Sequence, residues 1–191
     1  PSQPISPFSS PRPASLAQAA RSSLAPRTHS HRLSLAICDV SASMSERDAP
    51  HSQRRIDALN EILRLLQAEN PTLRLIAFSD APRYAAIPLP APGGSTALHL
   101  ALDFAVPIAP GSSVALISDG EPDDEAAALA AARRFPVAVN VFYCGPENGP
   151  GAVFLRLLAE LTGGQYQTTV LDARQALPAL RSVLALPSPR R

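Results

Sequence analysis

Oxygen-bearing side chains occur in three segments of this chain, and their types suit the binding of a hard cation. Asp39 is followed at alternate positions by the hydroxyls of Ser41 and Ser43, Thr96 ends a Gly-Gly-Ser-Thr segment, and Asp119 follows an apolar run. Mg²⁺ prefers oxygen ligands. Two carboxylates neutralise its charge, and three uncharged hydroxyls leave it electrophilic. We therefore predict a site for Mg²⁺ or Mn²⁺ with an open position that a carboxylate from another protein fills.

The elements around these segments place them at one edge of a sheet. Apolar runs typical of buried strands alternate with runs of helical periodicity. The predicted strands span 33–39, 73–79, 84–87, 114–118, 137–143 and 165–170, and the predicted helices span 56–66, 96–106, 123–134, 154–163 and the region from 172 onward. Buried strands separated by helices favour an α/β fold, a doubly wound, mostly parallel six-stranded sheet with helices on both faces. Ligands of such sheets bind beyond the carboxyl ends of the strands, where the three segments lie.

Several residues are expected to start, end or interrupt the helices. Asp123 or Asp124 is placed to cap the helix that runs to residue 134, and Asp172 begins the last helix. Gly163 ends the helix before it, and Pro178 should kink or restart the last one.

The motifs together resemble the von Willebrand factor A domain and its metal-ion-dependent adhesion site. Asp39-x-Ser41-x-Ser43 is followed by Gly-Gly-Ser-Thr-x-Leu-x-x-Ala-Leu around Thr96 and by Ser-Asp-Gly-Glu-Pro around Asp119, and the resemblance covers residues 32–186. It implies a Rossmann-like sheet of order 3-2-1-4-5-6 with a short antiparallel edge strand. It also implies that Ser41, Ser43 and Thr96 are hydroxyl ligands, and that Asp39 and Asp119 bind the metal directly or through water. In this family an Asp or Glu of a partner completes the coordination.

The function that this resemblance implies is a metal-dependent protein interaction without turnover. Intracellular bacterial members of the family work beside AAA+ ATPases of the MoxR or chelatase type, or in multi-protein stress and defence systems. Two alternatives stay open: a metal-dependent hydrolase of phosphoesters, and a structural subunit whose metal serves only folding. The sequence has no Gly-x-Ser-x-Gly elbow, no Asp-x-Asp and no phosphate loop with Lys, so an enzyme is the less favoured interpretation.

The composition of the chain limits which kinds of partner and which cellular location are expected. The chain has 191 residues, and 17 basic residues nearly balance 16 acidic ones, so neither nucleic acid nor an anionic membrane surface is an expected partner. No apolar stretch reaches the 18 or so residues of a membrane helix, and prolines interrupt the N-terminal segment where a secretory signal would need an apolar core. We expect a cytoplasmic protein with a disordered basic Pro- and Ser-rich arm at 1–31, a von Willebrand factor A domain at 32–186 and a basic stub at 187–191.

Other polar residues near the motifs have simpler interpretations. Arg54 and Arg55 are expected on a solvated helix face, with a basic patch beside the site as the alternative. His99 is expected at the helix surface. In the strand order of the family, Cys38 and Cys144 lie two strands apart, about 10 Å, which is beyond disulfide reach, so both should be free thiols.

Overall fold

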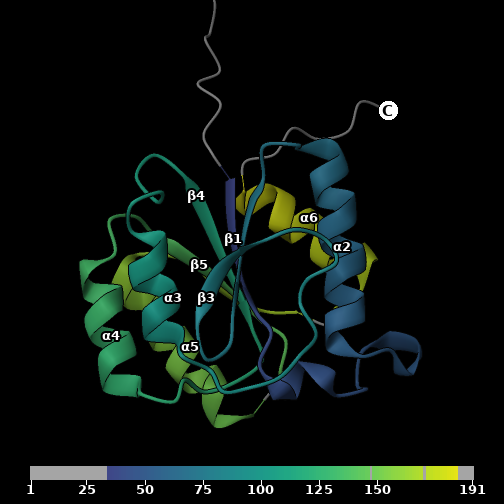
Figure 1. The fold of residues 1–191 in the computed structure, drawn as a ribbon, viewed down its shortest axis with the longest axis horizontal. Coiled ribbons are helices and arrows are strands. Elements are labelled where there is room, and N and C mark those ends of the chain that lie inside the picture. The colour runs from purple at the N-terminus through teal and green to yellow at the C-terminus, as the bar shows by residue number, and fades with distance from the viewer. Residues whose placement is uncertain (1–33, 147, 170, 185–191) are drawn as a thin grey trace, which may run out of the picture. The chain divides into compact units, whose positions relative to one another are not determined.

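The computed structural model describes residues 34–146, 148–169 and 171–184, which form a six-stranded sheet covered on both faces by helices (Figure 1). The predicted arm at 1–31 and stub at 187–191 lie outside the described residues, so the division of the chain into arm, domain and stub stays a prediction. The α/β architecture itself is confirmed.

The sheet has the predicted order, with its first strand in the centre. Its strands are β1 (Ser34–Asp39), β2 (Arg74–Phe78), β3 (Pro82–Ala85), β4 (Ser113–Ser118), β5 (Val139–Tyr143) and β6 (Tyr166–Thr168). They are arranged β3-β2-β1-β4-β5-β6. All neighbouring pairs are parallel except β2 and β3, which are antiparallel. The carboxyl ends of β1 and β4 therefore meet at the same edge.

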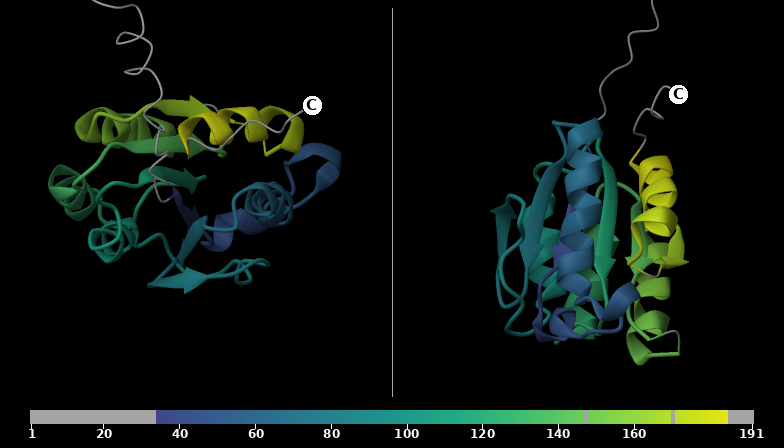
Figure 2. Two further views of the ribbon diagram at one scale, coloured as in Figure 1. Left: turned by 90° about the horizontal axis from the view of Figure 1, so that it is seen from above. Right: turned by 90° about the vertical axis from the view of Figure 1, so that its right-hand side faces the viewer.

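The helices form one layer on each face of the sheet. They are η1 (Ala42–Ser45), η2 (Pro50–Ser52), α2 (Arg55–Glu69), α3 (Leu98–Ala105), α4 (Glu125–Arg134), α5 (Pro150–Thr162) and α6 (Ala173–Val183). Helices α2 and α6 cover one face, and α3, α4 and α5 cover the other (Figures 1 and 2). Successive side chains of a strand point to opposite faces, so Ala36 and Cys38 pack toward α2 and α6, whereas Leu35 and Ile37 pack toward α3, α4 and α5.

The structure confirms most of the predicted helix caps, but not the predicted effect of Pro178. Asp124 caps α4 by accepting the Ala127 N–H at 2.8 Å, and Asp172 caps α6. Gly163 ends α5 in the left-handed conformation. Helix α6 does not restart at Pro178 but runs through it as one helix. A proline removes only one hydrogen bond, and buried side chains on both sides of Pro178 keep the helix against the sheet.

Several expectations about the bounds of elements were wrong in detail. The edge strand lies at 82–85 instead of 84–87, because a tight turn pairs Phe78 directly with Pro82. Helix α3 begins at Leu98 instead of residue 96. Helix α5 begins at Pro150 instead of residue 154, and two of its leucines, Leu157 and Leu161, are 42% and 39% exposed. The two cysteines, in contrast, are free as predicted, and both are buried.

Candidate metal site

The first carboxylate of the predicted site is fixed at the ends of two neighbouring strands. Cys38 of β1 pairs with Ile117 of β4, so the next residues, Asp39 and Ser118, also lie side by side. The Ser118 hydroxyl donates to Asp39 Oδ2 at 2.6 Å, and the backbone N–H of Ser41 donates to Oδ1 at 2.8 Å. Asp39 is fully buried. Its carboxylate is thus held by groups from both strand ends.

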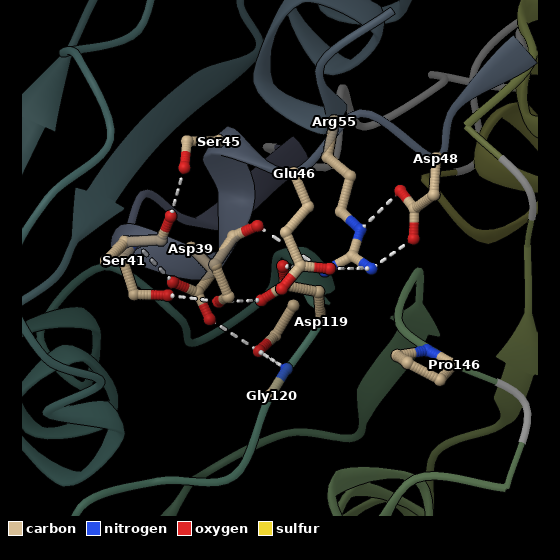
Figure 3. Close-up of polar contacts among 12 residues, drawn as sticks. Asp39, Ser41, Ser45, Glu46, Asp48, Arg55, Asp119, Gly120 and Pro146 are labelled. Atoms are coloured by element: carbon tan, nitrogen blue, oxygen red, sulfur yellow. Dashed lines mark hydrogen bonds and ion pairs between the residues drawn. The ribbon is translucent and has the colours of Figure 1, made fainter. Parts of the chain in front are cut away.

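Two serine hydroxyls connect β1 to the second carboxylate (Figure 3). After Ser41 the chain turns into η1, which brings Ser43 back toward the sheet edge. The Ser41 and Ser43 hydroxyl oxygens are 3.1 Å apart, and Ser43 donates to Asp119 Oδ1 at 2.8 Å. The structure therefore brings four of the five predicted residues together in one hydrogen-bonded group.

Thr96, the fifth predicted residue, lies in a loop at the same edge of the sheet. Asp123 accepts the Thr96 N–H at 2.9 Å and donates its own N–H to the Thr96 carbonyl oxygen at 3.1 Å. The Ala42 N–H also donates to the Gly94 carbonyl oxygen, which attaches this loop to η1. Thr96 is buried, but within the part of the chain that the structure describes no hydrogen bond joins its hydroxyl to the other four residues.

Gly94 and Asp80 shape this loop, and sequence analysis did not single out Asp80. Gly94 has a φ of +78°, and a Cβ there would lie 2.3 Å from Asp80 Oδ2. Asp80 accepts the Ser95 N–H at 2.8 Å. The glycine therefore lets the loop approach Asp80, and Asp80 holds the loop one residue before Thr96. The only sequence signal for this role was an Asp directly after a predicted strand.

Arg55 is the most important residue that sequence analysis misplaced. It does not lie on a solvated face: it is 2% exposed, and its Nη1 donates to Asp119 Oδ2 at 2.6 Å (Figure 3). Helical spacing contained a signal for this, because Arg55 precedes the buried Leu59 by four positions and the buried Ile62 by seven. Arg54, in contrast, is partly exposed and pairs with Asp57, as expected for a helix surface.

The other side of the guanidinium faces two carboxylates of the loop between η1 and α2. Arg55 Nε donates to Asp48 Oδ1 at 2.8 Å, and Nη2 contacts both Asp48 Oδ2 and Glu46 Oε2. Glu46 is exposed but belongs to this ion-pair group.

Burial and charge act on these groups in opposite directions. Burial raises the pKa of Asp39 to about 6, although the hydrogen bond from Ser118 opposes the shift. Hydrogen bonds from Arg55 hold the pKa of Asp48 below its usual range. For Arg55, burial lowers the pKa, but Asp48 and Asp119 raise it more, so its pKa stays above the ordinary value. Arg55 is therefore a permanent positive charge beside Asp119.

The residues present fit a hard divalent cation. Among the residues that the structure describes, no three His, Cys, Asp or Glu side chains are grouped to hold a metal, so a cation here would also need the hydroxyls. The group contains one guanidinium, that of Arg55, and four carboxylates, those of Asp39, Asp48, Asp119 and Glu46. Its formal net charge is therefore −3. Oxygen donors with excess negative charge suit Mg²⁺ or Mn²⁺.

A pocket lies next to this group, and Arg55 and Asp48 are among the residues that line it. Its volume is about 320 Å³, and its lining includes Asp48, Arg55, Tyr143, Thr168 and Gln175. The hollow beside the predicted metal position is lined by both polar and apolar residues.

The described histidines are not hydrogen-bond partners of the site serines, and the acceptor for Ser43 is the carboxylate of Asp119. Among the described residues, neither His51 nor His99 hydrogen-bonds Ser41 or Ser43. His99 is half-buried on α3, and its Nδ1 has no hydrogen-bond partner in the described part of the chain.

Comparisons with known proteins support the fold. No protein-family model matches the sequence, and no curated protein matches it. An aerotolerance-related membrane protein from Bacteroides fragilis matches with a TM-score of 0.61 at 17% identity, over 80% of this chain and 98% of that one. A von Willebrand factor type A structure from Catenulispora acidiphila matches with a TM-score of 0.58 at 18% identity, over 80% and 41%. The manganese-loaded TRAP protein of Plasmodium vivax matches with a TM-score of 0.53 at 20% identity, over 79% and 72%.

The described domain therefore has the von Willebrand factor A fold. In the same residues, no helix has both the length and the apolar character to cross a membrane.

Proposed function

We propose that this domain binds a partner protein through a divalent cation, Mg²⁺ or Mn²⁺, held by Asp39, Ser41, Ser43, Thr96 and Asp119. An Asp or Glu of the partner supplies the remaining ligand. One observation carries the proposal: Asp39, Ser41, Ser43 and Asp119 come from two strand ends, 80 residues apart in sequence, and lie in one hydrogen-bonded group. The manganese-loaded neighbour of the same fold supports a divalent metal.

In this proposal the domain's own residues bind and orient, and the metal supplies an electrophile for a carboxylate. Asp39 and Asp119 supply negative charge, and the hydroxyls of Ser41, Ser43 and Thr96 add neutral donors. We propose binding without turnover, because the carboxylate that accepts from Ser43 is the one that the metal would use, and the described histidines hydrogen-bond neither serine. We place the protein in the bacterial cytoplasm, and we propose a AAA+ ATPase of the MoxR or chelatase type as partner. A multi-protein stress or defence complex is the other setting we consider.

Metal binding is tested by titrating Mn²⁺ into the protein and measuring free Mn²⁺ by electron paramagnetic resonance. We expect Ser43→Ala and Asp119→Asn to weaken binding roughly tenfold or more, because each removes a donor that the cation needs. Ser45→Ala is the matched control: it removes a hydroxyl from the same helical turn, one that donates to the Ala42 carbonyl oxygen at 2.7 Å and not to the site. Equal binding by all three variants and the wild type would refute the site.

Partner binding is tested by pull-down with the tagged full chain in Mg²⁺ and in EDTA. We expect a protein that is retained in Mg²⁺ and lost both in EDTA and in the Ser43→Ala variant. Because the partner supplies a ligand, an Asp or Glu substitution in that protein should abolish binding as well. Retention of the same partner under all conditions contradicts a metal bridge.

A further inference from the structure

Arg55 contacts Asp119, one of the proposed metal ligands, so its positive charge lies close to the position proposed for the metal. The proposed set of ligands gives no reason for a buried arginine there. Its guanidinium is almost fully buried and donates at 2.6 Å to Asp119, whose side chain is 0% exposed. A buried carboxylate without a counter-charge is strongly unfavourable. In the metal-free protein, Arg55 supplies that counter-charge.

We infer that Arg55 is a built-in counter-cation of this site: it stabilises Asp119 when no metal is bound, and its charge opposes the binding of a metal. This inference rests on the proposed function, since it concerns the same cation. Arg55 is a positioning residue here and not a ligand. Its positive charge and that of the metal compete for one carboxylate.

Two exposed carboxylates, those of Asp48 and Glu46, allow Arg55 to stay paired when a metal binds Asp119. Asp48 and Glu46 are 53% and 58% exposed, and both contact the guanidinium from the solvent side. When a cation draws on Asp119, Arg55 keeps these two partners, so no buried charge is left unpaired. The arrangement therefore gives a domain that is folded without metal and binds metal more weakly than its donor set would otherwise allow.

The charge of Arg55 can be separated from its packing by two substitutions and a control. Arg55→Met removes the charge and keeps an unbranched side chain, whereas Arg55→Lys keeps the charge. Arg54→Met removes the same charge one position away, from a side chain that is 42% exposed and paired with Asp57. Exposed charges are screened by solvent and salt, so this control should change little.

We expect Arg55→Met to bind Mn²⁺ about tenfold more tightly than the wild type, since removing a unit positive charge close to a cation site strengthens the cation's attraction. Arg55→Lys and Arg54→Met should stay within about twofold of the wild type. The rise in melting temperature at saturating Mn²⁺ should be larger for Arg55→Met than for the wild type, because a ligand that binds only the folded state stabilises it in proportion to its affinity. Binding by Arg55→Met that is equal to or weaker than the wild type overturns the inference, as does equal tightening by Arg55→Lys.

If Arg55→Met does not fold in EDTA, millimolar Mn²⁺ should restore its circular dichroism spectrum, and adding Ser43→Ala to the same chain should abolish that rescue. A purely structural role of Arg55 predicts that Mn²⁺ stabilises Arg55→Met no more than it stabilises Ile76→Ala, a core variant that keeps Arg55, and that result would overturn the inference. Failure of the proposed function has a different signature: neither the wild type nor Arg55→Met would bind Mn²⁺ any better than Ser43→Ala does.

Discussion

At the scale of single residues, Ser118 is the clearest case of a side chain that serves the site without being a predicted ligand. Its hydroxyl donates to Asp39 Oδ2 at 2.6 Å in a fully buried position. Ser118→Ala leaves that carboxylate oxygen without a donor, and we expect the free energy of unfolding in EDTA to fall by about 1–3 kcal/mol. Urea unfolding followed by circular dichroism measures the change.

The matched control for Ser118 is Ser113→Ala, at the other end of the same strand. Ser113 is only half-buried, so its loss should change the free energy of unfolding by less than about 0.5 kcal/mol. Equal effects of the two substitutions would show that the hydrogen bond to Asp39 contributes nothing specific.

The types and spacing of residues predicted which side chains meet, but not how each is held. Asp39, Ser41 and Ser43 lie on one short segment, so their proximity follows from sequence. Arg55 and Asp119 are 64 residues apart, and although helical spacing places Arg55 on the buried face of α2, nothing in the sequence pairs it with Asp119. The same limit applies to Asp80, whose role depends on a loop that returns to it from residue 95.

At the scale of elements, the loop that carries Thr96 depends on Gly94. A side chain there would meet Asp80 and force a non-glycine residue into the left-handed region at a φ of +78°. We expect Gly94→Ala to lower the free energy of unfolding by about 1–3 kcal/mol. It should also weaken Mn²⁺ binding, because the displaced loop carries Thr96. Thermal unfolding and the Mn²⁺ titration measure the two effects.

Gly93→Ala tests whether position, and not glycine content, matters in this loop. A Cβ at Gly93 meets nothing within 4 Å. Its substitution should leave both stability and Mn²⁺ binding close to the wild type, and an effect as large as that of Gly94→Ala would refute the argument from Asp80.

Sequence periodicity predicted the buried elements better than the peripheral ones. The central strands are buried on both faces, so their apolar runs were unambiguous, and β1 is buried at every position. Strand β3 is an edge strand with exposed positions, so the alternation that would fix its limits is weak. On α5, exposed apolar residues such as Val153, which is 71% exposed, made it hard to predict which side of the helix packs on the sheet.

At the scale of the whole molecule, folding and metal binding draw on different residues. Two hydrophobic cores of the described residues, one on each face of the sheet, hold the strands together, and none of the five predicted metal ligands belongs to them. The buried charge of Asp119 is already paired by Arg55. The fold should therefore be stable without metal, which distinguishes an interaction module from a subunit whose metal serves only folding.

This distinction gives the last prediction, a comparison between removal of the metal and removal of core packing. In EDTA the wild type should unfold cooperatively and keep the circular dichroism spectrum that it has in Mg²⁺. Ile76→Ala, at a fully buried position of β2, should lower the free energy of unfolding by about 2–5 kcal/mol in either buffer, and the milder Ile76→Val by about 0.5–1.5 kcal/mol. Loss of the folded spectrum in EDTA alone would instead favour a metal with a folding role, because packing of the two cores would then be insufficient to hold the sheet.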